Sequence, residues 1–148
     1  MIFPVEGMPQ GKSRARTVRN KYTGKVHSFT PEKTAKYEEQ IRRAFKRWGG
    51  TSYGDKMLDV EIAAYFPIPK SYSKKNSTDA LLGIMRPTKK PDCDNIIKVV
   101  LDALNGVAYD DDKQVVCVSC NKYYAMDEDD GFITIEINEA ETAKENEE

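Results

Sequence analysis

The sequence predicts a single α+β domain in which helices pack on a mixed β-sheet that ends in an antiparallel hairpin. The chain has 148 residues, which fits one compact domain and leaves little room for two. Apolar residues recur at helical spacing in two segments, 30–48 and 92–104. Runs rich in β-branched and aromatic residues predict strands over 2–5, 58–68, 114–124 and 132–137. Because helical and strand segments interleave, helices packed on a mixed sheet are the natural architecture.

The first helix is expected to begin at Thr30, which supplies the cap, with Pro31 in the first turn and Glu32 at the positive end of the dipole. Gly49 and Gly50 stop it. Its apolar stripe, with Trp48 expected in the core, comprises Tyr37, Ile41, Ala44, Phe45 and Trp48. The opposite face is basic, which fits a solvated surface as well as a DNA-contacting one.

The remaining segments connect these elements. They are expected to form a loop over 7–16, a hairpin over 17–29, a short helix or ordered loop over 73–84 and an acidic turn over 126–131. The last ten residues are too polar to pack against a core. We therefore expect a folded domain over 1–138 and an acidic, disordered tail over 139–148.

The net charge of −1 conceals an uneven distribution. Residues 1–50 contain 12 Lys/Arg against 4 Asp/Glu, whereas residues 91–148 contain 4 Lys/Arg against 16 Asp/Glu. A basic first third is the electrostatic pattern expected of a protein that binds a polyanion. The acidic last third needs a separate explanation.

Composition also bears on the compartment. No stretch approaches the roughly 20 apolar residues that span a bilayer, and the first residues do not resemble a secretory signal. Three cysteines do not form a disulfide framework. We expect a cytoplasmic protein that makes no membrane contact.

The segment from Pro91 to Gly106 combines a helix with a group of charged residues. Pro91 bars a helix before it, Asp92 can serve as the cap, and Gly106 ends the helix. Its expected buried face comprises Cys93, Ile97, Val100, Leu101 and Leu104. Beside that face, a polar strip comprises Asp94, Lys98 and Asp102.

Further acids, Asp110 to Asp112, lead into the next strand. Carboxylates that lie close together repel, and a bound cation relieves the repulsion. Oxygen ligands suit magnesium, or manganese in its place. Each part also has a simpler explanation, because a helix start often carries acids for capping and an acidic triplet is usually a solvated turn. The combination with Lys98 favours a metal site that acts on phosphodiesters.

The motifs of the chain resemble the RusA family of Holliday-junction resolvases. The resemblance lies in Gly7 to Arg16, Pro91 to Lys98, Asp102 to Gly106 and Asp111 to Val115. It implies a homodimeric endodeoxyribonuclease that resolves four-way junctions by paired, symmetric nicks with magnesium, in DNA recombination and repair. By motif position, the metal ligands and the catalytic lysine would be Asp92, Asp94, Asp112 and Lys98. The extra acid Asp110 leaves open which member of the triplet is the main ligand, although the adjacent Gln114 favours Asp112.

The basic residues near these motifs are the expected DNA contacts, namely Lys12, Arg14, Arg16, Lys89 and Lys90. Two other functions are compatible with the same features. A non-catalytic DNA-binding module would use the basic loop alone, but its acids would then repel the DNA. A glycosyltransferase would use Asp-x-Asp to bind a nucleotide-sugar, but no nucleotide-binding βαβ motif precedes it.

Overall fold

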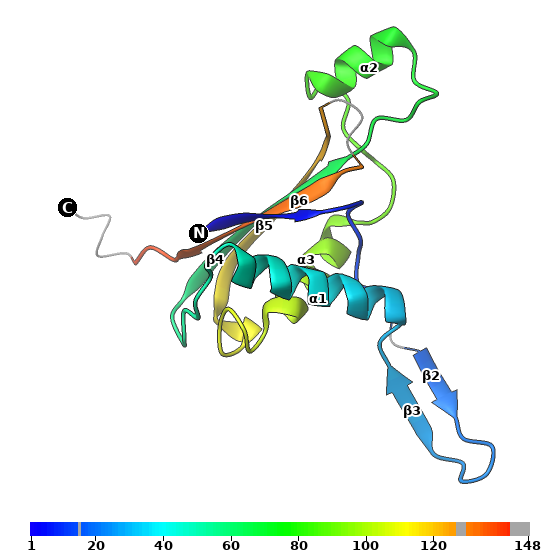
Figure 1. Cartoon of the computed structure of the whole chain (residues 1–148), viewed down its shortest axis with the longest axis vertical. Helices are drawn as coiled ribbons and strands as arrows, with labels where there is room; N and C mark the ends of the chain where they lie inside the picture. The colour runs from blue at the N-terminus through cyan, green and yellow to red at the C-terminus, as the bar shows by residue number, and fades with distance from the viewer. Residues whose placement is uncertain (15, 127–129, 143–148) are drawn as a thin grey trace.

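The computed structural model describes residues 1–14, 16–126 and 130–142. A four-stranded mixed sheet of order β1-β6-β4-β5 forms its centre (Figure 1). Its strands are β1 (Ile2–Glu6), β4 (Leu58–Phe66), β5 (Val115–Tyr124) and β6 (Phe132–Glu139). Helices α1 (Glu32–Arg47) and α3 (Cys93–Leu104) pack together on one face of the sheet. The prediction of one α+β domain with helices on a mixed sheet is confirmed.

Two smaller elements extend from this body at opposite ends (Figure 1). Helix α2 (Lys74–Leu81) follows β4, and the side chain of Ser73 caps it by accepting a hydrogen bond from the backbone of Asn76. At the other end, β2 (Arg16–Arg19) and β3 (Val26–Phe29) form a separate antiparallel hairpin, as the sequence predicted. None of the described helices is long and apolar enough to cross a membrane.

The two last strands are not a hairpin, so this part of the prediction is wrong. Strand β4 lies between them: it pairs in parallel with β5, through Ile62 and Cys120, and antiparallel with β6, through Ile62 and Ile135. The reason is burial. Alternate residues of β4 are fully buried, whereas β5 exposes Val116 and Val118. The more apolar strand takes the centre of the sheet, and the more polar strand takes its edge.

The start and end of α1 differ from the prediction. Pro31, rather than Thr30, occupies the cap position, and no side chain makes a capping hydrogen bond. Trp48 is 59% exposed, so its expected place in the core is wrong. The buried stripe ends at Phe45, and Trp48 falls on the C-cap residue, where Gly49 turns the chain away with φ of 81°. Beyond the last helical turn, the periodicity that predicted burial no longer applies.

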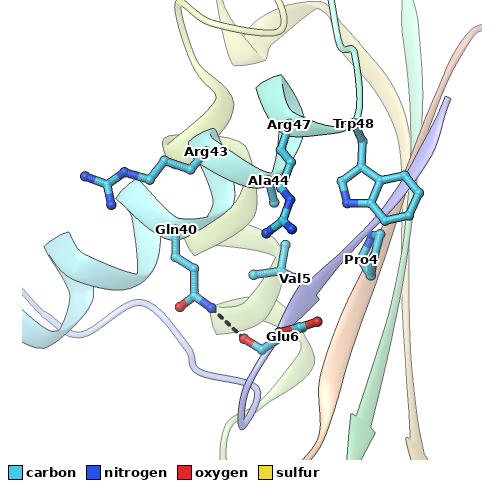
Figure 2. Close-up of a pocket in the computed structure, with 8 residues that line it drawn as sticks. All are labelled: Pro4, Val5, Glu6, Gln40, Arg43, Ala44, Arg47 and Trp48. Carbon is cyan, nitrogen blue, oxygen red and sulfur yellow. Dashed lines mark hydrogen bonds between the residues drawn. The ribbon is translucent and has the colours of Figure 1, made fainter.

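The indole of Trp48 instead lies beside Pro4 of β1, at the rim of a surface pocket of about 310 Å³ (Figure 2). Gln40 reaches across the pocket from α1 and donates a 2.6 Å hydrogen bond to the carbonyl oxygen of Glu6. Arg43 and Arg47 complete the wall formed by the helix. No residue of α3 lines this pocket, so it is separate from the acidic residues of that helix.

Helix α3 buries a face that is rotated from the predicted one. The fully buried residues are Ile96, Val99, Val100, Ala103 and Leu104, which face α1 and the sheet. Cys93, Ile97 and Leu101 were expected in the core but are only partly buried. The sequence predicted the position of the helix correctly but not its rotation about its own axis. Two overlapping sets of apolar residues fit the same helical period, and the prediction chose the wrong set for the buried face.

The ordered contacts of the sheet continue past the expected boundary of the tail. Strand β6 runs through Glu139, which pairs with Lys56 at 2.8 Å. The backbone of Ala140 still donates a hydrogen bond to Met57. Residues 143–148 of the expected tail lie outside the described residues.

Candidate active site

The loop that follows β1 lies directly on the first turn of α3. The backbone N–H of Lys12 donates a 2.9 Å hydrogen bond to the carbonyl oxygen of Asn95. Gly11 permits this close approach: a Cβ at that position would lie 2.8 Å from Asn95 Cβ and 3.0 Å from Pro91 Cβ. The basic loop predicted from the sequence is thereby placed beside the acidic start of the helix.

The carboxylates of Asp92 and Asp94 are exposed at this helix start. Asp92 occupies the N-cap position, yet its side chain makes no capping hydrogen bond. Among the described residues, neither carboxylate takes part in a salt bridge. A purely capping role for Asp92 therefore finds no support in the geometry, and both side chains are accessible to a cation.

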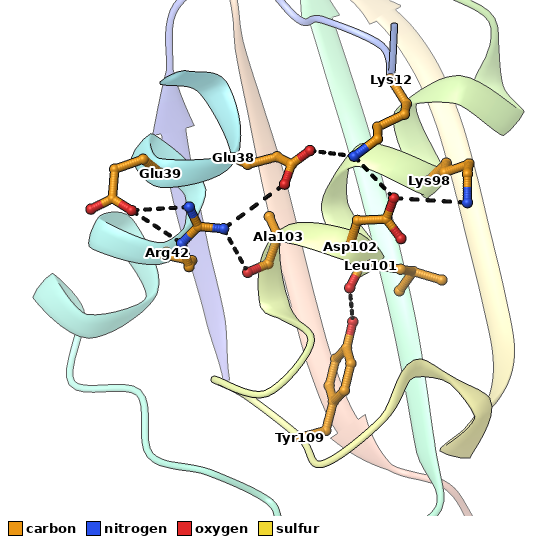
Figure 3. Close-up of polar contacts among 9 residues, drawn as sticks. All are labelled: Lys12, Glu38, Glu39, Arg42, Lys98, Leu101, Asp102, Ala103 and Tyr109. Carbon is orange, nitrogen blue, oxygen red and sulfur yellow. Dashed lines mark hydrogen bonds and ion pairs between the residues drawn. The ribbon is translucent and has the colours of Figure 1, made fainter. Parts of the chain in front are cut away.

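A network of charges joins the loop to both helices (Figure 3). The Lys12 ammonium lies 2.5 Å from Glu38 of α1 and 3.2 Å from Asp102 of α3. Burial lowers the pKa of Lys12, but the hydrogen bonds to the two carboxylates outweigh this effect and leave the pKa raised. Lys98 lies 3.8 Å from Asp102 and is 64% exposed. Lys12 is thus held between two acids, whereas Lys98 remains accessible.

We predict that Lys12 contributes to stability through these two carboxylates. Replacing it with methionine keeps the aliphatic chain but leaves Glu38 and Asp102 partly buried without their cation. The free energy of unfolding should fall by about 1–3 kcal/mol, measured by urea titration. The matched control is Lys36→Met, because Lys36 pairs with Glu32 at an exposed site, and its cost should stay below about 1 kcal/mol. Equal costs for the two variants would contradict a structural role for Lys12.

The acidic triplet is held in place by the segment around Gly54. The backbone N–H of Asp110 donates to the Gly54 carbonyl at 3.0 Å. The side chain of Gln114 donates to the carbonyls of Gly54 and Lys56, at 2.7 Å each. Nearby, the hydroxyl of buried Tyr109 donates to Leu101 of α3 at 2.6 Å. These bonds join the triplet to the loop before β4 and, through the neighbouring Tyr109, to α3.

The members of the triplet differ in their partners. Asp111 caps the short 3₁₀ turn Asp112–Gln114, and the backbone N–H of Lys113 lowers its pKa. The pKa of Asp112 is raised, first by burial and then by the nearby carboxylates of Asp111 and Asp102, while Lys98 opposes the shift. Asp111 caps the turn, whereas the charge on Asp112 is destabilised first by burial and then by neighbouring acids. A cation would relieve that repulsion, so the geometry favours Asp112 among the three.

The structure brings some of the predicted site residues together. Asp112 is near enough to Asp102 and Lys98 for their charges to shift its pKa in opposite directions, while Asp92 and Asp94 lie at the start of α3. Among the described residues, no three His, Cys, Asp or Glu side chains are grouped closely enough to hold a metal ion. Arg14, Lys89 and Lys90 are exposed, and Arg16 belongs to β2. The carbonyl oxygen of Lys89 accepts a hydrogen bond from Lys122.

Two features of the site were missed from the sequence. Asp102 was expected only as part of a polar strip, but it pairs with both Lys12 and Lys98. The cations of the β2–β3 hairpin, Arg19, Lys21 and Lys25, were not among the expected DNA contacts. A signal for them was present in the sequence, because no acidic residue occurs between Glu6 and Glu32.

The fold thus places exposed carboxylates at the start of α3 next to a basic loop. A family model described as endodeoxyribonuclease RusA matches residues 6–138. A protein of Bacillus subtilis (strain 168), named uncharacterized protein YqaN, is 36% identical over 126 residues, which cover 83% of this chain and 87% of that protein. The chain belongs to the RusA family of endodeoxyribonucleases.

Proposed function

We propose that the chain is a magnesium-dependent endonuclease that resolves four-way DNA junctions by paired, symmetric nicks during recombination and repair. One observation carries the proposal: Asp92 and Asp94 are exposed at the start of α3, where the basic loop docks on Asn95, and Lys98 follows one turn later. The pKa of Asp112, in the 3₁₀ turn before β5, is raised first by burial and then by neighbouring acids, and Lys98 is near enough to oppose this shift. The family match supports this proposal, because an endodeoxyribonuclease can use the acids to bind a metal ion and the basic residues to bind DNA.

The donor chemistry of these residues suits magnesium. Asp92, Asp94 and Asp112 would hold the ion, because they offer carboxylate oxygens and none of them takes part in a salt bridge among the described residues. Magnesium often binds through one or two carboxylates, with water and substrate phosphate as its other ligands. The lack of a closed group of three ligands among the described residues is compatible with such a site. When bound, the ion would polarise the scissile phosphodiester and help to generate hydroxide.

Lys98 would act on the phosphate itself. Its ammonium is exposed and only weakly engaged by Asp102, so it can approach a phosphate oxygen. Negative charge grows on that oxygen during attack, and a positioned cation stabilises this charge more than it stabilises the ground state. Asp102 would act as a positioning residue, because it contacts both Lys98 and the loop residue Lys12.

The charge distribution favours DNA approach from the helix side. Asp59, Glu61 and Glu136 are placed on the face of the sheet opposite the buried residues. This acidic face would repel a polyanion. The loop, the start of α3 and the hairpin lie on the other side, where the basic residues gather. DNA bound there would lie across Asp92 and Asp94.

Paired, symmetric cuts require two equivalent sites related by a twofold axis. One chain supplies one set of the residues described above. We therefore propose that the active form is a homodimer, which is also what the family resemblance implies. Sedimentation of the purified chain would measure this directly, and a monomer that still makes paired cuts would overturn it.

The decisive experiment is incubation of the purified chain with a synthetic four-way junction, linear duplex and supercoiled plasmid, with and without magnesium. The proposal expects symmetric nicks in the junction that depend on magnesium and little cutting of the duplex. Binding to every DNA without any cutting would support the alternative, a non-catalytic DNA-binding module. If the chain cuts the junction, the duplex and the plasmid equally well, it is a general nuclease without specificity for junctions.

The basic loop should contribute to DNA affinity through phosphate contacts. Neutralising Arg14 and Arg16 together is expected to weaken binding to all DNA shapes and to reduce the salt dependence by about one unit of log–log slope per lost contact. The measurement is a binding titration at several salt concentrations. The control is Lys74 and Lys75 neutralised together, because both are exposed on α2 at the other end of the molecule. An unchanged slope for the Arg14 and Arg16 variant would show that the loop faces away from DNA.

A further inference from the structure

The β2–β3 hairpin extends away from the domain, as Figure 1 shows. All of β3 and the intervening turn are exposed, and the exposed apolar residues of the hairpin are Val18 of β2 and Val26 and Phe29 of β3. An isolated two-stranded ribbon is marginally stable in water. The hairpin is therefore an exposed arm that projects from the domain.

The charge of the arm indicates what it contacts. No acidic residue occurs between Glu6 and Glu32, a stretch that contains six Lys/Arg residues. In the described part of the chain, Arg14, Arg19, Lys21 and Lys25 form no salt bridge. By contrast, Lys36 and Arg43 of α1 are paired with acids of their own helix. An extended ribbon of unpaired cations is complementary to a nucleic-acid backbone.

The tip of the arm is an ordered turn that presents an aromatic ring. The side chain of Asn20 accepts hydrogen bonds from the backbone of Tyr22 at 2.8 Å and of Thr23 at 3.2 Å. The Asn20 backbone also bonds to both Gly24 and Lys25. Gly24, with φ of 70°, closes the turn. Tyr22 is 98% exposed at its apex, with Lys21 beside it.

The arm also begins beside the acidic site. The loop that leads into it is bonded to α3 through Lys12 and Asn95, and to α1 through a 3.4 Å hydrogen bond from Ser13 N–H to Thr34 Oγ1. Strand β2 then carries the chain from Arg16 to Arg19, a span of roughly 10 Å, before the turn that holds Tyr22. DNA bound at the start of α3 would therefore lie next to the base of the arm, and the arm would extend from there along the DNA.

We propose that the arm grips the DNA backbone and that the ring of Tyr22 stacks on a base exposed at the branch point. This inference rests on the proposed function, because it needs a branched DNA substrate. In a continuous duplex the bases stack on one another and offer the ring no face, whereas bases next to a branch are more easily unstacked. Tyr22 is thus a specificity-determining residue that recognises DNA structure rather than sequence.

The test compares junction and duplex binding by the full chain carrying Asp94→Asn, so that no DNA is cut. Stacking depends on the ring, so Tyr22→Phe and Tyr22→Trp should keep the junction preference. Tyr22→Leu and Tyr22→Ala should weaken junction binding by about five- to tenfold, the scale of one lost base–aromatic stack, and leave duplex binding unchanged. Emission of the Tyr22→Trp variant should be quenched by the junction and not by the duplex, relative to the parent that contains only Trp48.

Ile84→Ala is the matched control, because Ile84 is 72% exposed and lies outside the arm. Equal loss on duplex and junction, or the same affinity for the phenylalanine and leucine variants, would overturn the role of stacking. A change in sedimentation on Tyr22→Ala would instead make the arm a contact between two copies of the chain. If the parent binds no DNA at all, the proposed function fails first, and the inference fails with it.

Discussion

Replacing Asp94 with asparagine is expected to abolish cleavage while junction binding stays unchanged or becomes tighter. The substitution removes a carboxylate that would hold magnesium, and it also removes a negative charge close to the DNA phosphates. The structure supports a substitution that keeps the fold, because the Asp94 side chain is exposed. Nicking of a labelled four-way junction and its binding affinity should be measured on the same preparation.

The control for this experiment is Asp59→Asn. Asp59 is placed on the face of the sheet opposite the buried residues, so the substitution removes the same charge away from the site. We expect it to cut at the parental rate. Normal nicking by the Asp94 variant would remove Asp94 from the catalytic residues and would leave Asp112 to be tested in the same way.

Lys98→Arg and Lys98→Ala are both expected to bind junctions with the fold intact, yet to lose cleavage by at least about a hundredfold, the scale of one lost preorganised charge. The competing explanation is a helix-stabilising pair with Asp102, one turn away. That pair exists, but it is loose at 3.8 Å and its lysine is 64% exposed. Such a pair is worth only roughly 0.3–0.5 kcal/mol, so its loss cannot account for a large effect on the rate.

Arginine separates these two explanations for Lys98. An exposed ion pair tolerates a guanidinium, whereas a compact point charge at a reacting phosphate does not, because guanidinium is larger and prefers a planar, bidentate contact. Single-turnover cleavage rates and unfolding curves of the two variants should be compared. A near-parental rate for Lys98→Arg would contradict a close contact with the phosphate. A near-parental rate for Lys98→Ala would assign the residue to the surface.

The elements themselves were well determined by local sequence. The hydrophobic periodicity and the positions of Gly and Pro correctly predicted most elements: strands β1, β4 and β6, the β2–β3 hairpin, and helices α1 and α3. These signals depend on residues that are neighbours along the chain. Local sequence did not predict the ends of α1 correctly. The helical periodicity placed Trp48 in the core, but the helix ends at Arg47 and the Trp48 side chain is exposed.

The pairing of strands could not be read in the same way. The sequence placed two strands next to each other in the chain and predicted a hairpin, but β4, about fifty residues earlier in the chain, inserts between them. Which strand takes the centre depends on burying the largest apolar surface of the whole sheet. That quantity is a property of the assembled domain rather than of any single segment.

For the candidate site, the sequence by itself singled out Asp92, Asp94 and Lys98: Asp92 precedes the helix that contains Asp94 and Lys98, so helical geometry alone brings them near one another. Tertiary structure alone decided the rest. It brought Asp112 within electrostatic range of Lys98 and Asp102, held Lys12 between two carboxylates and placed the hairpin as an arm that extends from the domain. The physical reason is that charges far apart in sequence interact only after packing of α1, α3 and β5 fixes the distances between them.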